Sequence, residues 1–355
     1  AREDLGGVLL TLQPNFSWLT CGSSNGIDTS REAGAGSLLV RSDGERFILA
    51  NRIEMPRLLD EEIRAADFQP VDFSWEEEKS PSFLTDQARR LLLPNQSLGA
   101  DAPFDQNTRM IEGLVSACRY QLTEPEIDRF RLLGKDAGEL VGELMQRLEP
   151  GETESKVARR VQDCLAARNI HCVVCLVAGD DRIRKYRHPV PTDRQWRKTL
   201  MVVVCARRHG LVASLTRIIC VGDEPDDLKV RTLASAQVNA KLFSATKPGA
   251  TGAALYELIS KSYADAGFPN EQLRHHQGGA CGYRTRDWVA HPASVDSVQV
   301  NQAFAWNPSV TGSKVEETCI AFSGGVEIIT ASPGWPSLSI EVDDHRYLLP
   351  GVLSR

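Results

Sequence analysis

The sequence has no run of about 18 or more apolar residues, which a membrane-spanning helix would need. It has no dense stretch of Lys and Arg, and its net charge is -6, which argues against a nucleic-acid partner. Residues 1–4 are mostly charged and no apolar segment follows them, so we expect no secretory signal. These absences predict a cytoplasmic protein that acts on neither membranes nor nucleic acids.

The cysteines lack the spacing of a disulfide framework. There are nine, an odd number, which suits a reducing compartment. Cys172 and Cys175 form a C-x-x-C within the apolar stretch 171–178, which predicts a buried strand. Residues three apart on a regular strand point to opposite faces, so we expect a structural role for this pair.

The chain of 355 residues is long enough for about two domains. Apolar runs at 7–12, 36–40 and 46–50 predict strands, and 41–45 has the composition of a hairpin turn. Thr123 then has the features of an N-cap at the start of a long amphipathic helix. We therefore expect a small N-terminal α/β domain at 1–121 and a second domain at 122–355.

An internal repeat is the strongest sign of organisation in the second domain. A Pro-Gly turn followed by Thr153 begins a predicted helix, and the same pattern with Thr251 recurs 98 residues further along. Each of these helices is preceded by another helical stretch and followed by a region rich in Gly and His. The pattern predicts a duplicated helix–helix–sheet unit with a site between the halves.

Six further motifs occur in a consistent order along the second domain. They lie at 188–194, 201–205, 210–217, 274–279, 306–308 and 314–318, and a final hairpin signature follows at 324–330. Together they resemble the pita-bread superfamily of creatinase, aminopeptidase P and prolidase. The resemblance implies an α/β (α+β) fold: a C-terminal pita-bread domain with an internal pseudo-twofold repeat, plus a smaller creatinase-like N-terminal domain.

The metal-ligand positions implied by the resemblance are mostly substituted. Such a site needs bridging carboxylates to hold two hard cations. Only one carboxylate remains, and Ser and Asn are neutral. The residues at the five positions are Cys205, Ser214, His276, Asn307 and Glu316.

These departures lead us to expect no metal cofactor and a creatinase-like, metal-independent hydrolase or lyase. It would act on a C–N bond of a small amino-acid-like or amidino compound. By the resemblance, His188 would be the general base, with His276 and Glu316 beside it. Arg217 and Arg286 would clamp a substrate carboxylate. The remaining substrate-side residues would be Cys205, Ser214, Asn307, His275 and Tyr283.

Several alternatives stay open at this point. The chain could be a non-catalytic descendant that binds a peptide, a small molecule or a protein in the old cleft. It could also be an Xaa-Pro metallopeptidase, or hold one Zn²⁺ between Cys205, His276 and Glu316. Cys205 itself is a nucleophile, a ligand or a core residue. The resemblance further implies a homodimer.

Overall fold

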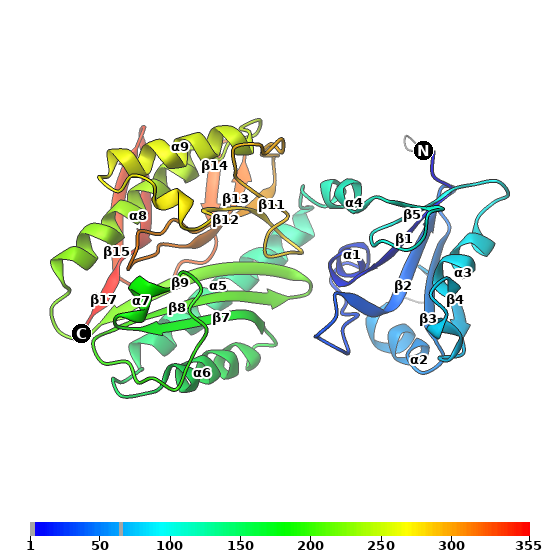
Figure 1. The fold of residues 1–355 in the computed structure, drawn as a ribbon, viewed down its shortest axis with the longest axis horizontal. Coiled ribbons are helices and arrows are strands. Elements are labelled where there is room, and N and C mark those ends of the chain that lie inside the picture. Colours follow the sequence, from blue (N-terminus) through cyan, green and yellow to red (C-terminus); the bar gives the residue numbers. More distant parts are fainter. Residues whose placement is uncertain (1–3, 64–66) are drawn as a thin grey trace. The chain divides into compact units, whose positions relative to one another are not determined.

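The computed structural model describes residues 4–63 and 67–355. The chain divides into two compact units, at 1–119 and 120–355 (Figure 1). Among the described residues, no helix is both long and apolar enough to cross a membrane.

The N-terminal unit is built on one six-stranded sheet in the order β4-β3-β2-β1-β5-β6. The predicted hairpin joins β2 to β3, and its turn contains Gly44 with φ +95°, a conformation that favours glycine. The strands are β1 (Gly7–Leu12), β2 (Ala33–Arg41), β3 (Arg46–Asn51), β4 (Gln69–Phe73), β5 (Leu98–Ala100) and β6 (Thr108–Met110). The α-helices are α1 (Gln13–Leu19), α2 (Met55–Arg57), α3 (Phe83–Leu91) and α4 (Glu112–Cys118).

Both faces of this sheet are covered, because neighbouring residues of β1 enter different clusters. Leu9 packs in one core cluster with Ala88 of α3, whereas Leu10 packs in another with Phe16 of α1. The unit therefore has its own core.

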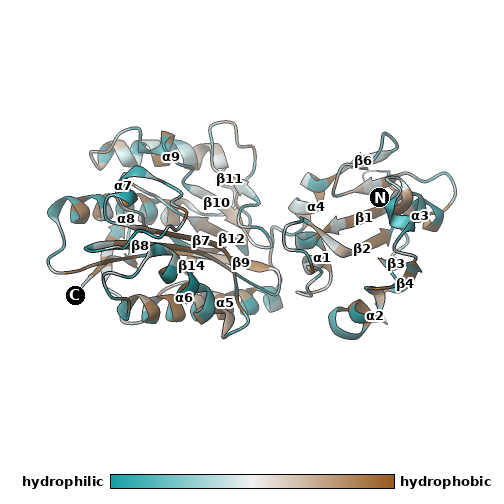
Figure 2. Cartoon of the chain, turned by 60° about the horizontal axis from the view of Figure 1, so that its bottom comes forward, coloured by the Kyte–Doolittle hydropathy of each residue, from teal (hydrophilic) through white to brown (hydrophobic). Residues whose placement is uncertain are grey.

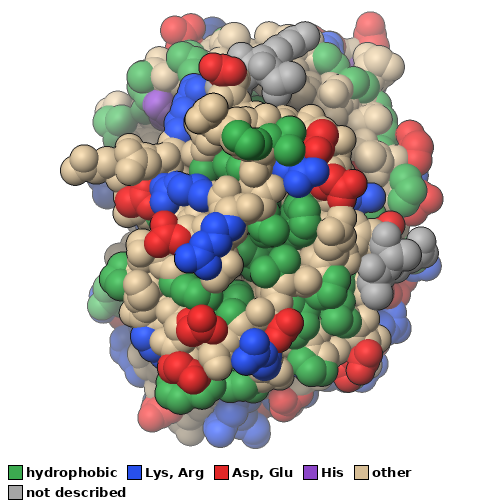
Figure 3. Space-filling view, turned by 90° about the vertical axis from the view of Figure 1, so that its right-hand side faces the viewer, with side chains coloured by type: hydrophobic (Ala, Val, Ile, Leu, Met, Phe, Trp, Pro, Cys, Tyr) green, Lys and Arg blue, Asp and Glu red, His purple; other side chains and the backbone are tan. Residues whose placement is uncertain are grey.

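Part of this unit's surface is also apolar, because Figure 3 shows hydrophobic side chains gathered among charged ones.

The C-terminal unit confirms the predicted repeat. Helices α5 (Glu124–Gln146) and α6 (Glu154–Ala166) form the first pair, and α8 (Asp226–Ala245) and α9 (Gly252–Asp265) form the second. Thr153 and Thr251 are the N-caps of α6 and α9, each accepting a backbone hydrogen bond through its side chain. Each of the two also makes an isolated antiparallel bridge to a later segment. The two halves therefore begin with the same local structure.

Two sheets lie between these helix pairs, with α5 and α6 on one side and α8 and α9 on the other (Figure 1), and a third, two-stranded sheet packs against α8. The hydrophobic residues concentrate on the central strands, and β9 is buried along its whole length (Figure 2). One sheet is β17 (Val352–Ser354), β9 (Leu211–Cys220), β8 (Thr199–Arg208) and β7 (His171–Gly179). The second is β11 (Trp288–Val289), β10 (Gly278–Cys281), β12 (Gln302–Trp306), β13 (Glu317–Phe322) and β14 (Gly325–Ile328). The third is the hairpin of β15 (Ser337–Val342) and β16 (His345–Pro350).

The expected arrangement of the C-x-x-C pair is corrected by a β-bulge in β7. Cys172 pairs with Ala206 while Val174 pairs with Cys205, so the register shifts between them. A bulge adds one residue to a strand and changes which side chains share a face. Cys172 and Cys175 pair with Ala206 and Val204, which are two apart on β8, so the two side chains share one face instead of pointing apart.

Candidate functional site

The two halves of the C-terminal unit meet where β9 runs beside the start of β13. The backbone N–H of Thr216 donates to the carbonyl of Glu316 over 3.2 Å, and that of Ser214 donates to Thr318 Oγ1 over 2.7 Å. Side chains from both halves converge at this junction. Of the five positions that correspond by the resemblance to metal ligands, Cys205, Ser214, His276 and Glu316 interact with one another here, and Asn307 follows directly after β12.

Glu316 is the centre of this group, and its carboxylate is already fully engaged. Its side chain is 2% exposed. Oε2 accepts from Thr216 Oγ1 at 2.8 Å and lies 3.1 Å from Lys314 Nζ, while Oε1 lies 3.4 Å from Arg286 Nη2. Burial by itself raises the pKa of Glu316, but Lys314 and Arg286 hold that pKa below its ordinary value. Glu316 is therefore an ionised carboxylate held by two cationic side chains.

Cys205 and Ser214 form a cross-strand pair between β8 and β9. Ser214 Oγ lies 3.2 Å from Cys205 Sγ, and both side chains are buried. Burial, and then the charge of Glu316, raise the pKa of the Cys205 thiol. A thiol that stays protonated is a poor nucleophile and a poor metal ligand. We therefore interpret Cys205 as a core residue that lines the site.

Asn307 supplies an acceptor that has no partner among the described residues. Its Oδ1 is buried, and its backbone N–H donates to the carbonyl of Gln277, next to His276. A buried carbonyl oxygen without a hydrogen bond is unfavourable. Asn307 is therefore suited to accept an N–H from a bound compound.

Three histidines, His188 from one segment and His275 and His276 from another, lie together on the opposite side of the site from Cys205 and Ser214. His188 Nε2 lies 3.0 Å from His275 Nε2, and the donor of the two depends on the tautomers. Burial, and then Lys314, lower the pKa of His188 and lower that of His275 to about 2. Burial, and then Arg286, lower the pKa of His276 to about 4. All three imidazoles are therefore neutral near pH 7.

These imidazoles also form a group of metal-type donors. Their ligand atoms all lie within 4.8 Å of one another. The rings of His275 and His276 are stacked, with centroids 4.5 Å apart and planes 23° apart. Imidazole lone pairs lie in the ring plane, so two nearly parallel rings do not aim at one point. Side-chain rotation would have to precede binding of a single ion.

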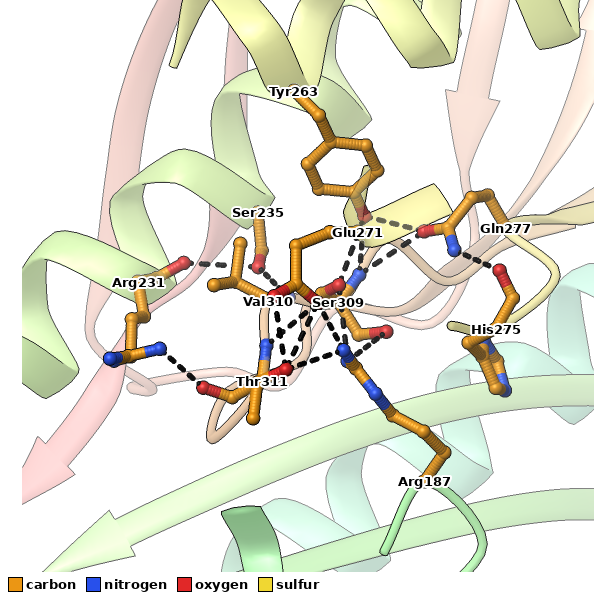
Figure 4. Close-up of polar contacts among 10 residues, drawn as sticks. All are labelled: Arg187, Arg231, Ser235, Tyr263, Glu271, His275, Gln277, Ser309, Val310 and Thr311. Atoms are coloured by element: carbon orange, nitrogen blue, oxygen red, sulfur yellow. Dashed lines mark hydrogen bonds and ion pairs between the residues drawn. The ribbon is translucent and has the colours of Figure 1, made fainter. Parts of the chain in front are cut away.

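A hydrogen-bonded network fixes the segments that carry the histidines and Asn307 (Figure 4). Tyr263 OH donates to Gln277 Oε1 and accepts the backbone N–H of Ser309 over 2.7 Å. Gln277 in turn donates to the carbonyl of His275. Arg187, the residue before His188, pairs with Glu271 and donates to Ser309 Oγ over 2.9 Å. The network therefore positions both walls of the site.

The structure separates some of the predicted residues from this group. Arg217 is buried on the other face of β9, where Nη2 lies 2.9 Å from Glu317 Oε1 and donates to the carbonyl of Thr330. Its donors are engaged, so the predicted substrate clamp by Arg217 is corrected. Tyr283 donates to Glu126 Oε1 over 2.7 Å, so its hydroxyl hydrogen is engaged at the start of α5. Arg286 does join the site, through Glu316.

Two residues of the site were missed from the sequence. Lys314 was detectable, because residues two apart in an extended segment share a face, which places Lys314 beside Glu316. Arg187 had no such signal, because its partners lie about 84 and 122 residues away along the chain. A glycine turn follows His276, with Gly278 at φ +102°. A Cβ at Gly278 would lie 2.1 Å from the carbonyl oxygen of Ala305, so this turn requires close backbone approach.

The fold of the chain is shared with several solved structures. A prolidase from Pyrococcus horikoshii OT3 superposes with a TM-score of 0.77 at 17% identity, over 93% of this chain and 95% of that chain. The dipeptidase PepE from Mycobacterium ulcerans gives 0.75 at 18% identity, over 94% and 92% of the two chains. The N-terminal domain of the FACT complex subunit SPT16 from Cicer arietinum gives 0.68 at 12% identity, over 93% and 91%. The predicted pita-bread fold is confirmed.

The sequence itself has detectable relatives. It is 24% identical over 219 residues to the probable dipeptidase PepE of Mycobacterium tuberculosis, which is 59% of this chain. The match spans 58% of the length of that curated relative. Residues 128–341 match metallopeptidase family M24, which covers more than half of the chain. The chain therefore belongs to metallopeptidase family M24.

Proposed function

We propose that this chain is a metal-independent hydrolase that cleaves a C–N bond of a small peptide-like, amino-acid-like or amidino compound. The observation that carries the proposal is the capture of Glu316 by Lys314 and Arg286. Two side-chain cations hold the one carboxylate that remains at the five ligand positions. The donor set does not fit two bridged divalent cations, because Ser214 and Asn307 are neutral and burial keeps the Cys205 thiol protonated.

The chemistry then depends on side chains alone. In the tautomer in which His188 Nε2–H donates to His275 Nε2, His188 Nδ1 is free to take a proton from water. The resulting hydroxide attacks the carbon of the scissile C–N bond. Arg286 and Lys314 stabilise the negative charge that develops on the oxygen, and Asn307 Oδ1 accepts an N–H of the substrate. The C–N bond breaks as the proton passes from His188 to the leaving nitrogen.

A second candidate is a metal-dependent peptidase of the Xaa-Pro type. Membership of family M24 and the likeness to prolidase and PepE favour it. The same comparisons support dipeptide-like compounds as the first substrates to try. This candidate requires metal ions to displace the cations that hold Glu316.

A third candidate is a non-catalytic binding protein. Both oxygens of the Glu316 carboxylate already have partners, which favours this candidate, because such a carboxylate is not free to act as an acid or base. In this case a ligand would occupy the Asn307 acceptor without being cleaved. Such a ligand would stabilise the folded protein, because it binds only the native state.

One experiment separates the three. Protein treated with a chelator is incubated with a panel of dipeptides and amidino compounds, and product formation and melting temperature are recorded together. Turnover that survives chelation supports the first candidate. Turnover that needs added Mn²⁺ or Co²⁺ supports the second, and stabilisation without product supports the third.

A further inference from the structure

The C-x-x-C pair lies outside the site just described. Cys175 Sγ lies 3.9 Å from the carbonyl oxygen of Ala158 in α6, so Cys175 faces that helix. Cys205 is the ladder partner of Val174, and its thiol faces Ser214. Adjacent residues of a strand point to opposite faces, so Cys175 and Cys205 are on different sides of the sheet.

Three features set Cys172 and Cys175 apart from the other cysteines. The bulge puts both side chains on one face of β7, because their partners Ala206 and Val204 are two residues apart on β8. Both are partly buried, as Cys164 is, whereas four other cysteines, Cys205, Cys220, Cys281 and Cys319, are buried. They lie on β7, an edge strand of its sheet, where the backbone has only one strand neighbour. Edge strands tolerate bulges and local adjustment better than central strands do.

We propose that Cys172 and Cys175 are a thiol pair that forms a reversible disulfide by exchange with a small-molecule disulfide, such as oxidised glutathione. The Cys175 thiolate attacks one sulfur of glutathione disulfide, forming a mixed disulfide and releasing one glutathione thiolate. Cys172 loses its proton and attacks the Cys175 sulfur, which releases the second glutathione. The protein pair is oxidised by two electrons and glutathione disulfide is reduced to two thiols.

The order of attack follows from the interaction between the two thiols. The neighbouring Cys172 side chain lowers the pKa of Cys175, against the effect of burial. The same contact raises the pKa of Cys172, so Cys172 is the resolving thiol. The closed loop contains only four residues, so the disulfide constrains the unfolded chain little and remains easy to reduce.

The test uses the full chain in its native state. Protein is equilibrated with mixtures of reduced and oxidised glutathione, blocked with N-ethylmaleimide and digested with trypsin. Residues 169–182 form one tryptic peptide with both thiols, and 161–168 form another with Cys164. The proposal predicts that peptide 169–182 escapes labelling and is lighter by two hydrogens, in a proportion that rises with oxidised glutathione.

Three other results would overturn the proposal. Peptide 169–182 labelled at both thiols, or carrying glutathione at each, would overturn the proposal, as would a peptide linked to Cys164. Cys164 is the matched control, because its thiol neighbours Cys175 and burial raises its pKa to about 11. Cys164→Ser should leave the disulfide unchanged, whereas Cys172→Ser should leave Cys175 as a mixed disulfide only. The primary result comes from the unmodified chain, so it stands whether or not a variant folds.

Discussion

Lys314 Nζ lies 3.1 Å from Glu316 Oε2, and both side chains are almost wholly buried. Arg286 completes the contact from the other oxygen of the same carboxylate. In a low-dielectric site these cations both neutralise Glu316 and present positive charge to a bound compound. This relationship is the basis of the proposed metal-independent chemistry.

Removing Lys314 should destabilise the fold. Lys314→Met leaves Glu316 with only Arg286 as a charged partner, so we expect a loss of roughly 3 kcal/mol in the free energy of unfolding. Urea denaturation measures it. Lys261→Met, which breaks the exposed pair with Asp265, is the control and should cost under about 1 kcal/mol. Adding Glu316→Gln to Lys314→Met should restore part of the lost free energy of unfolding. A double variant as unstable as Lys314→Met alone would contradict the ion pair between Lys314 and Glu316.

His188→Ala should lower kcat by roughly 10²–10⁴-fold on any substrate found, because a general base contributes about that much. His345→Ala, at an exposed position of β16, should leave kcat unchanged. Steady-state kinetics with circular dichroism checks both variants. A folded His188→Ala protein with normal kcat would remove His188 from the mechanism.

Activity should persist below pH 6.5. Burial lowers the pKa of His188 from its ordinary value of 6.5, so the neutral base survives further into acid. The kcat/KM profile should rise with pH through a midpoint below 6.5 and then level off. A midpoint above 6.5 would contradict the environment described for His188.

His276 should also make stability depend on pH. Its pKa is about 4 in the folded protein and 6.5 ordinarily, so between these values the unfolded chain binds more protons. Its contribution is present above pH 6.5 and is lost as the pH falls towards 4. His276→Asn cannot titrate at this position. The free energy of unfolding of the wild type minus that of the variant, measured by urea denaturation, should therefore decrease as the pH falls from 6.5 to 4. A flat difference would contradict the assignment.

Tyr263 should affect the site indirectly, by holding Gln277 and through it the backbone of His275. Tyr263→Phe leaves Gln277 Oε1 and the N–H of Ser309 without this partner, which should cost about 1–3 kcal/mol of stability. Because Gln277 holds the carbonyl of His275, KM and the pH midpoint should change as well. Tyr256→Phe in the same helix is the control. Loss of stability with unchanged kinetics would make the role of Tyr263 purely structural.

Much of the fold was predictable because its signals are local. The Thr caps, the repeated helix starts and the hairpin turn each depend on a few adjacent residues. The ordered motifs also located the strands that carry Cys205 and Ser214, and the segment before β13 that carries Glu316. The side-chain pairings were harder, because they depend on which face each strand turns inward.

Two cases illustrate this limit. The bulge at Cys172 has no marker such as glycine, and it reversed the expected separation of the two thiols. Arg217 was expected at the site, yet it pairs with the buried Glu317 across β9, a contact between residues about 100 positions apart. Neither outcome follows from neighbouring residues.

Metal content per chain tests the central claim most directly. The purified protein is offered excess Mn²⁺, Co²⁺ and Zn²⁺, desalted, and measured by mass spectrometry. The account predicts essentially no retained metal, because Lys314 and Arg286 hold the one available carboxylate. Two tightly held ions per chain would contradict it and return the metal-dependent peptidase to first place.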